Sequence, residues 1–238
     1  MSGGTSEQEL LIQLETALHR LVESFWEEPY RYFTESDAVT SLWQWFAQRP
    51  GLVEPYRTAD EAYRFETGLL HREYPTFFRL DDRDPKERKG RPFRRGHYDL
   101  VLLSPGFIQS NDAESVTNRR IKERPEHSVP PLVAAVEFKL SVREFRPERE
   151  TTIRHDLGKL KLALESPPDI GAAYMCVLWR DEKASPDNLE EYRDVVEKLL
   201  LEYPSIGFVL AASWPQHQSQ SFVHYGGPWL TAETDSPK

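Results

Sequence analysis

The chain has 238 residues, of which 39% are hydrophobic and 29% charged, and its formal net charge is −9. This balance is typical of a globular protein with one substantial core, and it argues against nonspecific coating of nucleic acid through excess Lys and Arg. No run is long enough for a membrane span, and the N-terminal MSGGTSEQEL lacks the features of a signal peptide. We therefore expect a cytoplasmic protein without a membrane partner. The single cysteine, Cys176, cannot form an internal disulfide.

Two helices are predicted near the start of the chain. Residues 7–28, EQELLIQLETALHRLVESFWEE, place apolar side chains at helical spacing, which predicts an amphipathic helix. Thr34 is followed three residues later by Asp37, a variant of the capping box, so we expect a second helix to begin there. Glu35 then lies in the first turn of that helix.

A third helix is predicted from the same kind of start signal. Thr58 and Glu61 repeat the capping relation, and the helix would run to about Leu70. Residues 71–78, HREYPTFF, would then be extended.

Two apolar segments follow that are short and rich in β-formers, as expected of interior strands. They are residues 97–103, HYDLVLL, and residues 131–140, PLVAAVEFKL. The polar connection between them, residues 104–130, is long for a compact domain, so we expect it to be either disordered or functional.

The second half of the chain alternates helices with apolar strands, which together with the preceding elements predicts a mixed α/β fold. The expected elements are a helix at 152–166, a strand at 172–179, a helix at 185–203 and a strand at 206–213. We divide the chain into an N-terminal helical extension (1–30), a single domain (31–228) and a polar C-terminal tail (229–238).

Charged residues interrupt both strands that flank the long connection. Side chains alternate along a strand, so Glu137 and Lys139 in VAAVEFKLS share one face, and Lys139 alone could neutralise Glu137 as a plain ion pair at a sheet edge. Asp99 places a second carboxylate in the neighbouring apolar strand, and two close carboxylates favour a divalent cation. Carboxylate oxygens suit Mg²⁺ or Mn²⁺, and a lysine beside such an ion can hold or deprotonate a water. This combination indicates metal-assisted phosphodiester hydrolysis.

Glu35 in a capped helix, YDLVLL with Asp99, VEFK with Glu137 and Lys139, and the following HDLGKLKLAL together resemble the PD-(D/E)xK nuclease superfamily. The resemblance covers roughly residues 34–180. It implies a restriction-endonuclease-like core, with a mixed central β-sheet flanked by helices in the order helix, three strands, helix, strand. This order fits if residues 71–78 are the first strand and the predicted helix before them is an insertion.

The resemblance also assigns roles to the residues. Asp99 and Glu137 would bind Mg²⁺ or Mn²⁺ together with the Phe138 backbone carbonyl, and Lys139 would lie near the attacking water. The catalytic set is thus Asp99, Glu137, Lys139 and, from the first helix, Glu35. Glu66 and Glu73 are rivals for the place of Glu35, which could also simply favour the helix N-terminus. Tyr98 replaces the proline of the family motif.

Two further residues are candidates on the helix that follows the motif. Asp156 and Lys159 are three residues apart and therefore neighbours, so they form either a surface ion pair or part of a substrate-facing surface, as the resemblance implies.

Two basic runs, residues 86–95 and 119–124, flank the strand that carries Asp99. They are either ordinary solvated loops or a surface that binds the phosphate backbone. The candidate nucleic-acid-binding residues are Arg91, Arg94, Arg95, Arg119, Arg120 and Lys122. We predict a Mg²⁺-dependent nuclease of defence or repair with DNA favoured over RNA as substrate, and leave a protein partner or a homodimer open. The alternative is a catalytically silent binding or assembly module on the same fold.

Overall fold

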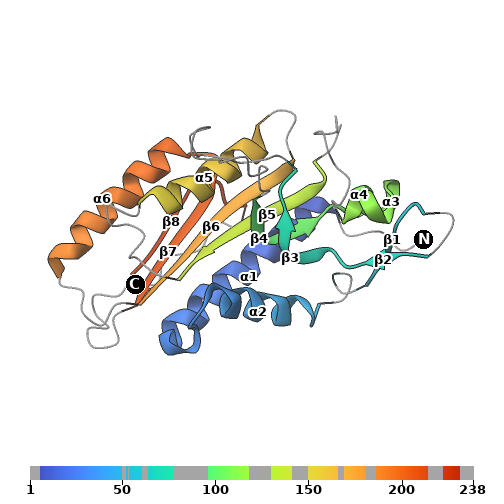
Figure 1. Cartoon of the computed structure of the whole chain (residues 1–238). Helices are drawn as coiled ribbons and strands as arrows, with labels where there is room; N and C mark the ends of the chain where they lie inside the picture. The colour runs from blue at the N-terminus through green and yellow to red at the C-terminus, as the bar shows by residue number, and fades with distance from the viewer. Residues whose placement is uncertain are drawn as a thin grey trace, which may run out of the picture.

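The structure is a computed structural model that describes residues 6–49, 52, 54–60, 64–77, 96–117, 130–140, 150–165, 169–180, 186–213 and 222–230. Within these ranges, six strands form one sheet in the order β3-β4-β5-β6-β7-β8 (Figure 1). Their bounds are β3 Leu70–Pro75, β4 His97–Leu103, β5 Leu132–Lys139, β6 Ile170–Arg180, β7 Gly207–Ser213 and β8 Phe222–Gly226. The pairs β5–β6 and β6–β7 are parallel and the other three are antiparallel. The predicted mixed α/β class is confirmed.

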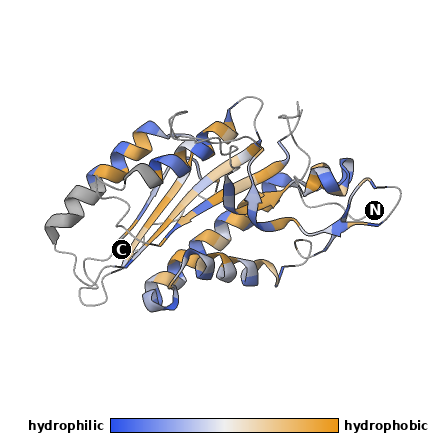
Figure 2. Cartoon of the chain, in the orientation of Figure 1, coloured by the Kyte–Doolittle hydropathy of each residue, from blue (hydrophilic) through white to orange (hydrophobic). Residues whose placement is uncertain are grey.

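Helices cover both faces of the sheet. Helices α5 (Glu150–Leu164) and α6 (Pro186–Glu202) connect the parallel strands and lie together on one face (Figure 1). Helices α1 (Glu7–Glu27) and α2 (Glu35–Phe46) lie on the other, where α1 crosses β5, β6 and β7. Strands covered on both sides need apolar residues on both sides, and every residue of β7 is buried. Figure 2 shows that the inner strands of the sheet are mostly hydrophobic.

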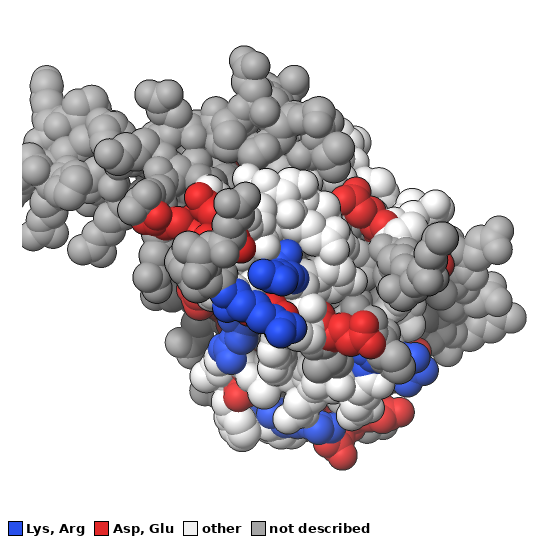
Figure 3. Space-filling model, turned by 90° about the vertical axis from the view of Figure 1, so that its right-hand side faces the viewer, with Lys and Arg blue, Asp and Glu red and all other residues white. Residues whose placement is uncertain are grey.

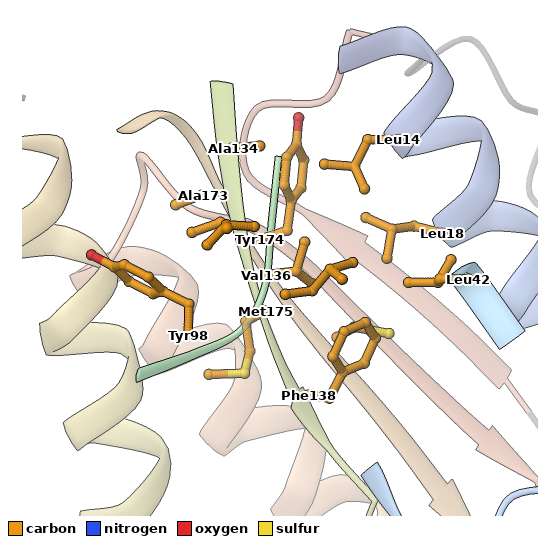
Figure 4. Close-up of a cluster of buried hydrophobic side chains, with 14 of the residues drawn as sticks. Leu14, Leu18, Leu42, Tyr98, Ala134, Val136, Phe138, Ala173, Tyr174 and Met175 are labelled. Atoms are coloured by element: carbon orange, nitrogen blue, oxygen red, sulfur yellow. The ribbon is translucent and has the colours of Figure 1, made fainter. Parts of the chain in front are cut away.

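The strand alternation expected for β5 directs its two faces to different layers. Leu14 and Leu18 of α1 face Val136 and Phe138 of β5, and Leu42 of α2 lies beside them (Figure 4). The charged face of the strand therefore points to the opposite layer, where α5 lies.

The expected capping box begins α2. The Thr34 hydroxyl accepts a hydrogen bond from the Asp37 backbone N–H, and the Asp37 carboxylate accepts one from the Thr34 N–H. The first four N–H groups of a helix have no partner within it, and this box satisfies two of the donors at the helix start, which favours a start at this point. Glu35 is thereby held at the first position of α2.

The third predicted helix, up to Leu70, is wrong. Two short antiparallel strands, β1 (Tyr56–Arg57) and β2 (Glu66–Thr67), occupy this part of the chain, and β3 follows as expected. The Thr58 hydroxyl donates to Asp60 Oδ2 at 2.6 Å instead of capping a helix, and the Thr58 backbone N–H donates to the Phe65 carbonyl at 3.1 Å. Thr and Asp side chains offer the backbone such local alternatives to a helix.

The connection after β4 is also more regular than expected. It begins with two short helices, α3 (Pro105–Ser110) and α4 (Ala113–Val116), capped by Ser104 and Asp112. Residues 118–129 of this connection lie outside the described part of the chain.

The sequence did not predict β8, which adds an antiparallel edge to β7. Trp229 and Leu230, assigned to a polar tail, lie close to α1, because the Leu230 N–H donates to Glu15 Oε1 at 2.9 Å. Trp229 packs against the core. Among the described helices, none is long and apolar enough to cross a membrane. The division of the chain into an extension, a domain and a tail stays a prediction.

The turn after β8 gives a test of the fold. Gly227 has a φ of +74°, and a Cβ there would lie 2.0 Å from the Ile206 carbonyl oxygen. Gly227→Ala should destabilise the protein by more than about 2 kcal/mol, since strain and the backbone contact add. Gly158, inside α5, has open space around its Cα. The control Gly158→Ala should stabilise the protein by about 0.5–1 kcal/mol. Urea unfolding measures both, and equal midpoints for Gly227→Ala and wild type would contradict this account of the turn.

Candidate functional site

The charged face of β5 meets two charged residues of α5. Lys159 Nζ lies 2.6 Å from Glu137 Oε1, and Lys139 Nζ lies 2.9 Å from Asp156 Oδ2. Lys159 Nζ also lies 3.1 Å from Asp156 Oδ1. All four residues are buried. The expectation that Asp156 and Lys159 form a surface pair is wrong, because their helix packs this face directly on the sheet.

Glu35 joins this group from the other layer. Its Oε1 lies 3.5 Å from Lys139 Nζ, and the side chain is half-buried at the N-terminus of α2. The rivals lie elsewhere: Glu66 accepts from Arg64 Nε at 2.5 Å in β2, and Glu73 is exposed on β3. Glu73 also has a φ of +50°, which interrupts the regular alternation of side chains along β3. Of the three glutamates, the structure brings Glu35 to the lysine.

Asp99 lies where β4 and β5 stop pairing. The register of this antiparallel pair ends at Leu100 opposite Val136, and Asp99 Oδ2 accepts a hydrogen bond from the Phe138 N–H at 2.7 Å. The carboxylate thus takes the place that a strand carbonyl would fill. We call Glu35, Asp99, Glu137, Lys139, Asp156 and Lys159 the acid–lysine cluster.

The two lysines of the cluster differ in how many donors are used. An ammonium group has three N–H bonds. Lys159 Nζ lies within reach of three acceptors, because the His97 carbonyl, at 2.7 Å, adds to Glu137 and Asp156. In the described part of the chain, Lys139 Nζ contacts two carboxylates, one of them at a long 3.5 Å. Lys159 is therefore a fixed counter-charge, whereas Lys139 retains donor capacity.

The carboxylates of the cluster divide into two kinds. Burial raises the pKa of Asp99, and it raises the pKa of Glu137 well above its ordinary range despite the nearby lysines. Burial also raises the pKa of Asp156, but Lys159 and Lys139 outweigh it, and the net pKa is lowered. The lysines thus outweigh burial at Asp156 but not at Asp99 and Glu137.

Both lysines stay protonated. Burial lowers the pKa of Lys139, but the attraction of Asp156 and Glu35 is stronger, so the pKa lies above its usual value. Glu137 and Asp156 raise the pKa of Lys159 in the same way against burial. The cluster thus has four carboxyl groups for two ammonium groups, too few cations to balance all four carboxylates if each were ionised.

Sequence reasoning did not foresee the contact between Lys159 and Glu137. The burial of Asp156 did have a signal in the sequence. Asp156 is three residues after the buried Ile153 and four before the buried Leu160, which places it on the apolar side of α5. The predicted nucleic-acid-binding residues lie outside the described residues; they are Arg91, Arg94, Arg95, Arg119, Arg120 and Lys122.

Comparison with known proteins adds no relative: neither a family model, nor a curated protein, nor a solved structure matches the chain. In the described part of the chain, no group of three or more His, Cys, Asp and Glu side chains is arranged to hold a metal ion. The resemblance to the PD-(D/E)xK superfamily, the metal and the activity therefore stay predictions.

The raised pKa of Asp99 predicts the effect of removing its charge. Asp99→Asn keeps an acceptor for the Phe138 N–H but no longer buries a poorly compensated charge, so at neutral pH the variant should unfold at a higher temperature than wild type. Below neutral pH the advantage should shrink. The pKa of Asp99 in the folded state lies above its ordinary value of 3.8, so the folded state holds the proton more tightly than the unfolded state. The cost of the ionised carboxylate is therefore present above the folded-state pKa and disappears as the pH falls through it.

Asp156→Asn is the matched control for that experiment. It removes the partner that both lysines share, so it should lower the free energy of unfolding at neutral pH by about 3 kcal/mol, the scale for breaking a buried ion pair. Thermal and urea unfolding at several pH values measure both variants. An Asp99→Asn variant less stable than wild type at neutral pH would show that this aspartate is a structural anchor.

Proposed function

We propose that the protein is a Mg²⁺-dependent nuclease that hydrolyses phosphodiester bonds, with DNA favoured over RNA as substrate. The observation that carries this proposal is the convergence of Asp99, Glu137 and Lys139, which come from two strands, with Glu35 from α2. The elements from α2 to β6 are also compatible with the helix, three strands, helix, strand order of a restriction-endonuclease-like core if β1, β2 and the short helices α3 and α4 are counted as insertions. In this comparison the β1–β2 pair replaces the predicted helical insertion.

The donor set fits a hard divalent cation. Asp99 and Glu137 would supply carboxylate oxygens and Phe138 a backbone carbonyl, and such oxygens suit Mg²⁺ or Mn²⁺. Burial raises the pKa of both carboxyl groups, and the cluster has more carboxyl groups than lysines, so a divalent cation would favour their ionised forms. Asp99, Glu137 and the Phe138 carbonyl would hold the ion. When bound, it would supply Lewis-acid activation of water and of the phosphoryl oxygen.

The residues of the chain have separate tasks in this proposal. Lys139, kept protonated by Asp156, offers an N–H to an anionic oxygen of the substrate or to the attacking water. Its raised pKa favours this role over that of a general base. Lys159 holds Glu137 in position, and Asp156 anchors both lysines. Preorganised cations of this kind stabilise charge that develops in a transition state.

A nucleic-acid substrate needs positive charge along its path. On the face shown in Figure 3, the described Lys and Arg side chains lie among Asp and Glu side chains. With a net charge of −9, the chain lacks a general excess of positive charge. The basic runs at 86–95 and 119–124 are accordingly the proposed contacts with the phosphate backbone, and a protein partner or a homodimer could add to them.

A catalytically silent module on the same fold is the second candidate. Asp99 and Glu137 each already have a partner within the protein, the Phe138 N–H and Lys159 respectively. A binding or assembly module would use the acid–lysine cluster only to fix α5 and α2 on the sheet.

Lys139→Met separates the two candidates. In a nuclease it should keep the fold and the affinity for Mn²⁺ but lose on the order of 10² or more in cleavage rate. The exposed Lys161, on the same helix as Asp156, provides the matched control, and Lys161→Met should cleave at the wild-type rate. Wild type and both variants are compared on single- and double-stranded DNA and on RNA, with Mg²⁺, with Mn²⁺ and with EDTA. Metal-dependent cleavage by Lys139→Met at the wild-type rate would remove this lysine from the mechanism.

Charge reversal tests the basic runs. Replacing the six predicted nucleic-acid-binding residues by Glu should weaken DNA binding and flatten its dependence on salt, because each phosphate contact releases counterions. Single reversals should have small, similar effects. Filter binding across a range of salt concentrations measures how the DNA affinity of wild type and of each variant depends on salt. An unchanged salt dependence in the sixfold variant would show that the runs are ordinary solvated loops.

A further inference from the structure

The connection between α1 and α2 exposes two aromatic rings beside an arginine. Phe33 is 73% exposed and Tyr30, in the short helix η1 (Pro29–Arg31), is 46% exposed. The Arg180 guanidinium carbon lies 4.7 Å from the centre of the Tyr30 ring and 5.8 Å from that of Phe33. We call Tyr30, Phe33 and Arg180 the aromatic platform.

The platform is held in place by the backbone. Arg180 Nη1 donates to the Pro29 carbonyl at 3.2 Å, so the guanidinium is fixed against the connection and its plane is available to both rings. Single exposed aromatics are ordinary on a protein surface. Two of them beside one guanidinium combine exposed aromatic surface with a positive charge, and both aromatic rings and guanidinium groups stack on planar groups.

The platform lies next to the acid–lysine cluster. Phe33 precedes Glu35 by two residues, and Thr34 between them begins α2. Arg180 ends β6 and Lys139 ends the neighbouring parallel strand β5, where Lys139 is paired with Val177. The C-terminal ends of both strands therefore lie at the same end of the sheet. Arg180 lies three residues beyond Val177, the partner of Lys139, so the platform is a short distance along the sheet from Lys139. A nucleic acid bound at Lys139 could therefore reach the platform.

We propose that the aromatic platform stacks an unpaired base of a single-stranded nucleic acid whose backbone continues into the acid–lysine cluster. This rests on the proposed nuclease function and adds its substrate class. Bases inside a duplex are stacked on one another, so their faces cannot lie on a protein ring, whereas single strands and splayed ends offer them. Arg180 adds attraction for the phosphate charge next to that base.

The test measures binding without cleavage. Fluorescein-labelled oligothymidine, oligouridine and a short DNA duplex are titrated in EDTA and followed by fluorescence anisotropy. Phe33→Ala should weaken binding of at least one single strand about tenfold, the scale for losing one base–aromatic stack, and leave duplex binding unchanged. Phe33→Trp should restore wild-type affinity because it restores a stacking surface. Leu201, 83% exposed on α6, provides the control Leu201→Ala, which should bind as wild type.

The outcomes separate this inference from the proposed function. Wild-type affinity of Phe33→Ala for both single strands, an equal loss for single strand and duplex, or no single-strand binding by wild type would each overturn the platform. Metal-dependent cleavage by the same preparation would leave the nuclease proposal standing in those cases. Conversely, selective loss in Phe33→Ala without any cleavage by wild type would support the platform and count against the nuclease. Thermal unfolding of Phe33→Ala should match wild type, as expected for an exposed side chain.

Discussion

The structure depends on the compensation of charge buried between β5 and α5. Glu137 in the central part of the sheet is covered on both sides, and an isolated carboxylate there would cost several kcal/mol. Lys159 meets it at 2.6 Å, and Asp156 joins Lys159 to Lys139. These contacts join α5 to the sheet beside its buried apolar residues Ile153, Leu157 and Leu160. Asp99 and Glu35 then complete the group from β4 and α2.

This compensation is incomplete, and the incompleteness gives the cluster its chemical character. A purely structural network would balance its charges, as Asp156 does with two lysines. Asp99 and Glu137 instead have raised pKa values, because burial outweighs the attraction of the nearby lysines. The two lysines differ in their hydrogen bonding: Lys159 Nζ has three acceptors, whereas Lys139 Nζ can still donate an N–H to another acceptor.

A second buried carboxylate, in another part of the molecule, is held by neutral hydrogen-bond donors. Glu15 of α1 is fully buried and accepts hydrogen bonds from the Tyr174 hydroxyl at 2.7 Å and from the Leu230 N–H. These bonds join α1, β6 and the segment after β8. Neutral donors satisfy the carboxylate there, which is the arrangement expected of a structural group. The contrast with the lysine-rich cluster supports separate roles for the two sites.

The sequence alone determined the elements with strong local signals. Apolar periodicity predicted α1, α5, α6 and the strands β4 to β7, the capping box of Thr34 and Asp37 placed α2, and alternation put Glu137 and Lys139 on one face. It did not exclude a helix after Thr58 or predict β8, because short strands obtain their stability from partners distant in the chain. Only the tertiary structure decided that Glu35 rather than Glu66 or Glu73 reaches Lys139, and that Lys159 neutralises Glu137. Those contacts join different layers of the fold, and local sequence patterns do not determine how a helix packs on a sheet.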